Sequence, residues 1–378
     1  MKKILLIIIG LFVVIAIGLF FHLDNADKTT NSVNIGSILP LTGERSSVGI
    51  SAKNGIKLAV EEINASAYLG NKSISLFIED SKGIPANSLS SFEKLTTAND
   101  VIAIIGPLGS SEVLSIAPKA EQRKIVIMTP AASSPLITEA GDYIFRNVAS
   151  DLYEATLMAD AVVNTFKKDR VAIAYINNDY GNGVSKKFAE GLKRNGRDLI
   201  ISEAYEEGRT DFRTVILKLK KANPDAIYIV GYKEIAYFIK QLKEQGINSS
   251  LFTTAIFEDP EIISIAGNSA EGIIFTTFYL DEDSKEQRTR DFFHNYERKY
   301  NVKPDGYAAT SYDATYLIAQ AIKNEGVTSD SVKKGLYEIK DFPGLLGNFS
   351  IDKNGDVVLP IRMKTIKEGQ LINFNLNK

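Results

Sequence analysis

Two loops of small and hydroxyl-bearing residues carry the side chains whose types and spacing could do chemistry in this chain. Residues 106–111 (Gly-Pro-Leu-Gly-Ser-Ser) follow an apolar run at 101–105, and residues 129–134 (Thr-Pro-Ala-Ala-Ser-Ser) follow an apolar run at 125–128. Each run is typical of a buried strand. Such loops, at the carboxyl ends of parallel strands, form a crevice rich in N–H and hydroxyl donors. This chemistry suits the carboxylate of a small solute.

Four residues of these loops are candidate ligand contacts. Ser110 could donate its hydroxyl to a ligand, and it is also a good N-cap for the helical pattern that follows; the two roles are compatible. Ala131, Ala132 and Ser133 could offer backbone N–H and C=O groups and one hydroxyl. The alternative for these three residues is a plain turn between a strand and a helix, flanked by prolines.

Two tyrosines follow other predicted strands. Tyr180 lies in a loop of asparagines and glycines at residues 177–183, and Tyr232 follows the apolar run at 226–230. Both rings could form the wall of a cleft. The alternatives are an incidental tyrosine in a surface turn for Tyr180 and packing against the next helix for Tyr232.

The sequence offers little for catalysis. It contains two histidines and no cysteine. His22 ends an apolar N-terminal segment, and His294 lies in a polar helical pattern. Neither a nucleophile elbow nor a zinc-protease motif occurs, and the loop at residues 42–49 lacks the glycine spacing of a nucleotide site. We therefore expect no enzyme, no cofactor and no metal site.

The elements that must position these loops follow an alternating pattern. The predicted strands are residues 33–39, 74–78, 101–105, 125–128, 171–176, 199–204, 226–230 and 272–278. Segments with helical periodicity separate them, as in Ile56, Ala59, Val60 and Ile63. Continuous apolar strands between amphipathic helices indicate parallel sheets covered on both faces. The alternation occurs twice, with a pause near residues 142–153, so the 378 residues predict two similar α/β lobes.

Charge and the N-terminus bear on location. Lysine and arginine number 44 and acidic residues 46, with no basic block, so nucleic acid is not expected as a partner. Two lysines precede an apolar run at residues 4–21, which is either a cleaved signal peptide or a membrane anchor. The poor cleavage site after it favours an anchor, with 1–23 as the targeting segment and 24–32 as a polar tether. Either way, the rest of the chain is exported.

Several motifs recur in one order along nearly the whole exported chain. They are residues 35–43 (Ile-Gly-Ser-Ile-Leu-Pro-Leu-Thr-Gly), 58–64, 79–81, 105–107 with Ser110, 144–146, 179–183, and Tyr307 with 312–314. In this the chain resembles type I periplasmic binding proteins, in the Leu/Ile/Val-binding branch of the solute receptors of ABC importers.

The resemblance implies a particular architecture and mode of action. It implies an α/β fold of two doubly wound parallel-sheet lobes joined by three hinge crossovers. Lobe 1 would hold residues 33–149 and 278–359, and lobe 2 residues 150–277 and 360–378. A solute would bind between the lobes, which close by hinge motion. The closed form, expected to be a monomer, would then dock on a membrane permease.

The resemblance also implies roles for particular residues. The positions that hold an α-carboxylate in amino-acid-binding relatives match Ser110, Ala131 and Ser133. Aromatic positions of the family match Tyr180, Tyr232 and Tyr307.

Two positions depart from the family pattern. The aromatic residue of the first loop falls at or near Val48, and the acidic residue that pairs with the ligand ammonium falls near Ile256. A shift of two residues would bring Glu258 to the second position. An ammonium in a closed cleft needs a counter-charge, since its desolvation is otherwise uncompensated. If Glu258 does not reach it, an aliphatic or aromatic carboxylate or an amide would fit better than an amino acid.

The expected function is therefore a binding protein of an ABC importer, for an amino acid or a similar small carboxylate. The alternative is a ligand-sensing module that reports to a separate membrane signalling protein, because this fold serves both purposes.

Overall fold

The computed structural model describes residues 32–278, 280–359 and 361–374. The predicted signal peptide or anchor and nearly all of the predicted tether lie outside the described residues. No helix within the described ranges is long and apolar enough to cross a membrane.

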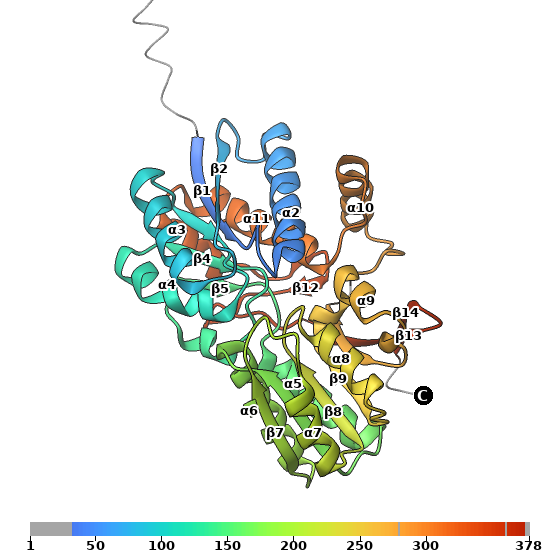
Figure 1. Ribbon diagram of the computed structural model, residues 1–378. Coiled ribbons are helices and arrows are strands. Elements are labelled where there is room, and N and C mark those ends of the chain that lie inside the picture. Colours follow the sequence, from blue (N-terminus) through green and yellow to red (C-terminus); the bar gives the residue numbers. More distant parts are fainter. Residues whose placement is uncertain (1–31, 279, 360, 375–378) are drawn as a thin grey trace, which may run out of the picture.

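The first sheet holds five parallel strands in the order β2-β1-β3-β4-β5. Their bounds are β1 Ser32–Leu39, β2 Ser73–Asp80, β3 Ala103–Ile105, β4 Val126–Thr129 and β5 Ile144–Arg146. The helices of this lobe are α2 Ser46–Ala65, α3 Pro85–Ala98, α4 Ser110–Arg123, α11 Gly306–Glu325 and α12 Ser329–Tyr337. Helix α2 packs on α11, and α3 packs on α4, so helices cover both faces of the sheet (Figure 1).

The second sheet holds seven strands in the order β14-β13-β10-β9-β8-β6-β7. Their bounds are β6 Val171–Ile176, β7 Leu199–Tyr205, β8 Ala226–Val230, β9 Ser250–Thr253, β10 Ile274–Phe278, β13 Ile361–Lys367 and β14 Gln370–Phe374. The five strands from β6 to β10 are parallel, whereas β13 and β14 are antiparallel additions at the β10 edge. The principal helices of this lobe are α5 Asp151–Asp160, α6 Asp179–Arg194, α7 Arg213–Ala222, α8 Ile235–Glu244 and α9 Pro260–Ala266.

Other elements complete the fold. Helix α10, Gln287–Tyr300, packs beside α2, and β11 (Phe342–Gly344) and β12 (Gly347–Phe349) form a small hairpin. Short helical turns occur at η1 Pro135–Glu139, η2 Ala161–Thr165, η3 Ala255–Glu258 and η4 Gly267–Ala270.

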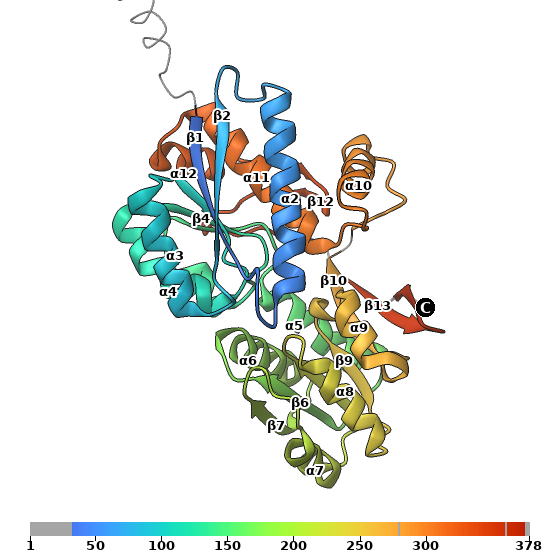
Figure 2. The same cartoon turned by 45° about the horizontal axis from the view of Figure 1, so that its top comes forward.

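The predicted α/β fold of two lobes is confirmed, and each predicted strand has a counterpart. The expectation of purely parallel sheets misses the antiparallel edge formed by β13 and β14. The chain passes between the lobes three times: after β5, after β10, and between β12 and β13 (Figure 2). The residue boundaries given above for the lobes stay a prediction.

The helices form where apolar side chains recur on one face. Helix α6 buries Tyr180, Val184, Phe188 and Leu192, four residues apart, and leaves lysines on its outer face. Strands such as β8 are buried along their whole length, as expected for a strand covered on both faces. These packed layers hold the carboxyl ends of β1, β3 and β4 opposite those of β6, β8 and β9.

Candidate functional site

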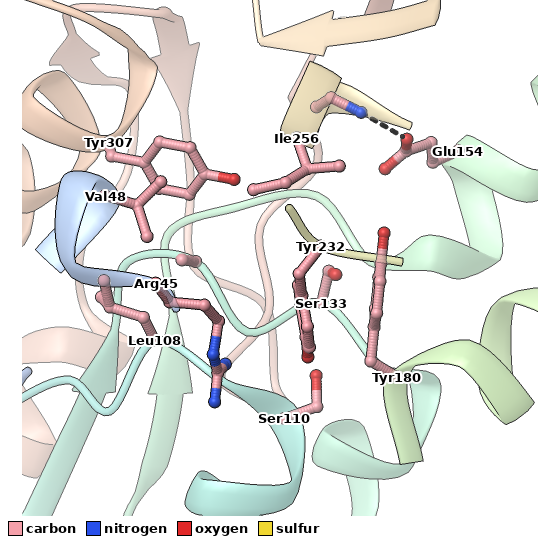
Figure 3. A pocket seen from close by; sticks show the side chains of 12 residues that line it. Arg45, Val48, Leu108, Ser110, Ser133, Glu154, Tyr180, Tyr232, Ile256 and Tyr307 are labelled. Carbon is pink, nitrogen blue, oxygen red and sulfur yellow. Dashed lines mark hydrogen bonds between the residues drawn. The ribbon is translucent and has the colours of Figure 1, made fainter. Parts of the chain in front are cut away.

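A pocket lies between the two lobes, where the loops after these strands meet (Figure 3). Its space is small, with about 60 Å³ open to the centre of a water molecule. The lining residues are Arg45, Val48, Leu108, Ser110, Ala131, Ser133, Glu154, Tyr180, Tyr232, Ala255, Ile256 and Tyr307. Six of the eight residues predicted from the sequence are thus brought together, and both lobes contribute to the lining.

The hydroxyl-bearing loops form one end of the pocket. Ser110 is the first residue of α4, directly after Gly109, and it is buried. Its Oγ accepts a hydrogen bond from the Ser134 backbone N–H at 3.2 Å, which ties the two loops together. Ser133 and Ala131 lie beside it in the lining. Because the first N–H groups of a helix favour anions, this end suits a carboxylate.

Arg146 holds the second loop from beneath. This fully buried side chain donates to the carbonyl oxygens of Ser133 at 3.1 Å and Ser134 at 2.9 Å. Its guanidinium also pairs with both carboxylate oxygens of Asp356 at 2.7 Å. Arg146 thereby takes up both carbonyl oxygens and fixes the loop, and Ser133 of this loop lines the pocket. Arg146 is therefore a positioning residue.

Two stacked tyrosines form the wall contributed by the second lobe. The ring centroids of Tyr180 and Tyr232 are 5.5 Å apart with planes 15° from parallel. The Tyr180 hydroxyl donates to Thr254 Oγ1 at 2.9 Å. Burial raises the pKa of Tyr180 and of Tyr232 above the usual value, so both hydroxyls stay neutral. Tyr307, near the start of α11, contributes a third phenol, which is partly buried and whose pKa is raised by desolvation.

Arg45 also lines the pocket, and the sequence analysis did not propose it. Its guanidinium lies over the Tyr232 ring, 4.5 Å from the centroid, and its Nη2 is 3.2 Å from Glu112 Oε2. Burial by itself would lower the pKa of Arg45, but Tyr232, Glu112 and other acidic groups around it raise the pKa overall. Arg45 lies in the loop at residues 42–49 that the sequence analysis considered, but its neighbours in the sequence do not indicate that it is buried.

Glu154 is the second charged lining residue that the sequence analysis missed. It lies in the first turn of α5, and its side chain is 6% exposed. Its Oε1 accepts from the Ala255 N–H at 3.4 Å and from the Thr276 hydroxyl. Burial raises the pKa of the Glu154 carboxyl, and these two hydrogen bonds partly oppose the shift. Glu154 comes just after the predicted pause at residues 142–153, and its neighbours in the sequence gave no indication that it would face the cleft.

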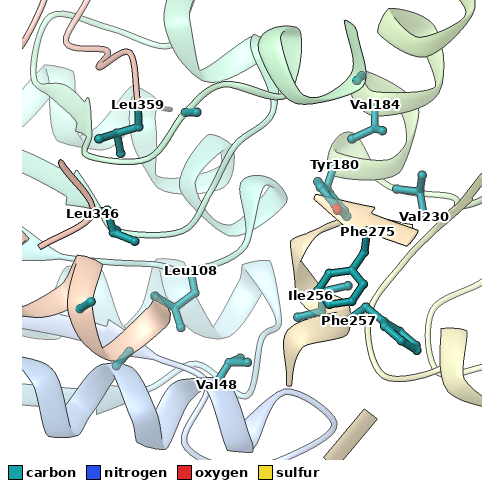
Figure 4. Close-up of a cluster of buried hydrophobic side chains, with 14 of the residues drawn as sticks. Val48, Leu108, Tyr180, Val184, Val230, Ile256, Phe257, Phe275, Leu346 and Leu359 are labelled. Carbon is teal, nitrogen blue, oxygen red and sulfur yellow. The ribbon is translucent and has the colours of Figure 1, made fainter. Parts of the chain in front are cut away.

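Apolar side chains close the remaining sides. Val48 and Leu108 come from the first lobe, and Ala255 and Ile256 from the turn η3 in the second. Figure 4 shows Val48 and Leu108 opposite Ile256, with Phe257 and Phe275 packed behind. These two phenylalanine rings are 5.5 Å apart and fix η3 against the sheet.

The comparisons with known proteins agree with this geometry. A family model described as "Periplasmic binding protein" matches residues 32–370.

The chain belongs to the periplasmic binding protein family.

Individual relatives cover most of this chain. The Leu/Ile/Val-binding protein homolog 3 of Brucella melitensis is 25% identical over 332 residues, covering 87% of this chain and 89% of its own. A leucine binding protein structure from Thermotoga maritima has a TM-score of 0.85 and 28% identity, covering 91% of this chain and 98% of its own.

A third comparison includes a bound ligand. The branched-chain amino acid transporter substrate binding protein of Streptococcus pneumoniae, solved in complex with isoleucine, has a TM-score of 0.84 and 27% identity. That match covers 90% of this chain and 97% of the other. The resemblance drawn from the sequence motifs is thereby confirmed.

Membership of this family also has consequences for the activity of the chain and for its location. Periplasmic binding proteins bind solutes and are not enzymes, as the sequence predicted for this chain. The family implies an extracytoplasmic location.

Two predicted contacts of this periplasmic binding protein do not line the pocket. Ala132 is buried beneath the loop, and its N–H donates to Thr129 Oγ1 at 3.0 Å. Glu258 lies at the far end of η3, where its carboxylate pairs with Lys364 and accepts from Thr277. The shift of two residues along this one-turn helix carries the carboxylate away from the pocket, whereas Ile256 does line it.

Proposed function

We propose that this chain is the solute-binding protein of an ABC importer and captures a small carboxylate-bearing solute by closure of its two lobes. The observation that carries the proposal is the pocket itself, which combines hydroxyl and N–H donors from one lobe with stacked phenols from the other. Ser110, Ala131 and Ser133 would hold the carboxylate.

The surroundings of the pocket support capture without chemical change. Nothing in the lining provides an activated nucleophile, because the hydroxyls of Ser110 and Ser133 have no histidine beside them in the pocket. The small space favours one solute molecule over a peptide. The similar structure from Thermotoga maritima is a leucine binding protein, and that from Streptococcus pneumoniae holds isoleucine, which supports a small solute of this kind. The closed form would then dock on a membrane permease.

A ligand screen by thermal unfolding tests this function. The panel holds leucine, isoleucine, valine, phenylalanine, their 2-oxo acids, aromatic carboxylates and short amides. A ligand that binds only the folded protein raises the melting temperature, by linkage. We expect at least one carboxylate to raise it in a saturable way. A panel in which no carboxylate has any effect would contradict the proposal, and turnover of a bound ligand would contradict a pure binding role.

A further inference from the structure

One end of the pocket holds a carboxylate that the carboxylate-binding role does not use. In Figure 3, Glu154 lies at the end toward which the Tyr180 hydroxyl points, while Ser110 lies toward the other end. Glu154 is buried and lines the pocket. The hydrogen bonds given above engage its Oε1, from the Ala255 N–H and the Thr276 hydroxyl. The side chain is thus held in place by two elements of the second lobe.

A second buried acid lies three residues earlier on the same helix. Asp151 is fully buried, and within the described part of the chain neither of its carboxylate oxygens has a hydrogen-bond partner of ordinary geometry, although the Ser133 side chain lies near enough to lower its pKa slightly. Its backbone N–H donates to the Ser133 carbonyl at 2.8 Å, which places it beside the donor loop. The buried hydroxyl of Tyr228 likewise has no partner among the described residues. Buried polar groups of this kind usually have partners in a native structure.

The positive charge near this pair is already engaged. Burial raises the pKa of Asp151, and the Ser133 side chain and the Arg146 charge oppose only part of that rise; the Arg146 guanidinium itself bonds to Asp356, Thr138 and the two loop carbonyl oxygens. Burial raises the pKa of both acids, and the charge of Glu154 raises that of Asp151 further. Two buried carboxylates without a dedicated cation are costly unless a proton or a cationic ligand compensates them.

We propose that Glu154, supported by Asp151, accepts the ammonium group of the ligand, so that the pocket takes a small zwitterionic amino acid. Its carboxylate lies at Ser110 and Ser133, and its amino group lies at Glu154. This assignment rests on the proposed solute-binding function. Glu154 would supply the counter-charge for the ammonium group. Ile256 has no charge, and Glu258 is paired with Lys364 outside the pocket.

The first test compares matched ligands by titration calorimetry on the purified protein. Each amino acid (leucine, isoleucine, valine and 4-aminobutanoate) is paired with its counterpart lacking the amino group. We expect the wild type to bind at least one amino acid about tenfold or more tightly than its counterpart. Glu154→Gln should lose about 10- to 100-fold for that amino acid and keep its affinity for the counterpart. Glu258→Gln, a glutamate outside the pocket, is the matched control and should bind as the wild type does.

The second measurement is proton release by the wild type, which needs no variant. Several groups near Glu154 carry or could carry charge. They face Glu154 itself or its neighbour Asp151, and they are Asp151, Tyr180, Tyr228, Tyr307 and Arg146. When the ligand ammonium binds, it favours the ionised form of the Glu154 carboxyl. The raised pKa of that carboxyl therefore falls, and a proton is released from it. Amino acid affinity should therefore weaken as the pH falls. Binding enthalpies in buffers of different ionisation enthalpy should report net proton release, reduced in Glu154→Gln.

Each outcome decides the proposal. Equal affinity for the amino acid and its counterpart, or an unchanged preference in Glu154→Gln, would overturn it. If carboxylates without an amino group bind and amino acids do not, the ammonium site is wrong while the proposed solute-binding function stands. If neither class binds, both fail. A melting temperature of ligand-free Glu154→Gln close to that of the wild type confirms that the variant is folded, and proton release by the wild type stands independently of it.

Discussion

At the scale of single residues, the Ser110 hydroxyl contributes both to the fold and to the candidate site. It is buried at the start of α4 and accepts a hydrogen bond from the Ser134 N–H. Its own hydrogen is left for an acceptor in the pocket. A ligand carboxylate at this position would accept a hydrogen bond from the neutral Ser110 hydroxyl. The Ser110 side chain would not need to move, because its bond to the Ser134 N–H already fixes the position of Oγ.

Ser110→Ala should weaken ligand binding by about 1–3 kcal/mol, because the ligand carboxylate and the Ser134 N–H each lose a buried partner. The dissociation constant from calorimetry, with the ligand found in the screen, measures this. Ser115→Ala is the control on the same helix, since its hydroxyl bonds to Pro85 and Glu112 carbonyl oxygens outside the pocket. Affinity equal to that of the wild type in Ser110→Ala would remove Ser110 from the site.

Most of the site residues that could be predicted from the sequence lie in the loops or helix starts that follow a strand, whereas Tyr307 was predicted from the family resemblance. Ser110, Tyr180 and Tyr232 occupy such positions, and the direction of the strand alone places them at the cleft. Arg45 and Glu154 could not be found this way, because their burial depends on partners far away in sequence, such as Glu112 and Thr276. A local pattern marks both as ordinary surface charges.

At the scale of elements, the turn from β6 into α6 positions the tyrosine wall. Gly181 lies in the first turn of α6, and a Cβ built there would lie 1.9 Å from the Ile176 carbonyl oxygen. Only glycine allows the helix to start so close to the strand. The Asn178 side chain accepts from the Gly181 N–H at 3.0 Å and caps this start. Tyr180 is thereby held against Thr254 and Tyr232.

Gly181→Ala should destabilise the protein by about 2–3 kcal/mol, because an added methyl group must push the helix start away from β6. The same shift moves Tyr180, so ligand affinity should fall as well. Thermal unfolding and calorimetry measure the two effects. Glu190→Ala, a half-exposed position on the same helix, should change neither property. A fully stable variant with normal affinity would show that the close approach at Gly181 is unimportant.

Strong periodicity made most elements predictable. Burial on both faces gives a continuous apolar run, as in β1, β6 and β8, and burial on one face gives the amphipathic stripe of α6. Both patterns can be recognised in the sequence. The strands β13 and β14 were missed for a physical reason. They lie at a sheet edge and are partly or largely exposed, so their structure depends on the pairing of β13 with β10 and of β14 with β13.

At the scale of the whole molecule, direct bonds join the lobes around the pocket. Ser47 of α2 donates to Asp259 Oδ2, just before α9, at 2.7 Å. The Ser134 hydroxyl donates to the Asp179 carbonyl at 3.2 Å, and the Asp179 N–H donates to Ser111 Oγ at 3.3 Å. In Figure 2 the start of α2 lies close to the second lobe. The structure is therefore a closed arrangement, and we expect these bonds to be lost when the lobes separate.

Ser47→Ala should weaken ligand binding by about 0.5–1.5 kcal/mol, or roughly 2- to 10-fold, although Ser47 does not line the pocket. The reason is that the bond to Asp259 exists only when the lobes are closed, so its loss favours the open form. Asp259 keeps its second role, because its Oδ1 still accepts from the Glu261 N–H and caps α9. The folded lobes themselves should be unaffected, and the melting temperature without ligand should stay near that of the wild type.

The measurement combines calorimetry with small-angle X-ray scattering. The wild type should contract on ligand addition, and Ser47→Ala should need more ligand to reach the same radius of gyration. Ser46→Ala is the adjacent control, because the Ser46 hydroxyl makes no hydrogen bond within the residues that the structure describes. If Ser47→Ala binds and contracts as the wild type does, the Ser47–Asp259 bond contributes nothing to closure. The affinity would then depend on contacts inside the pocket alone.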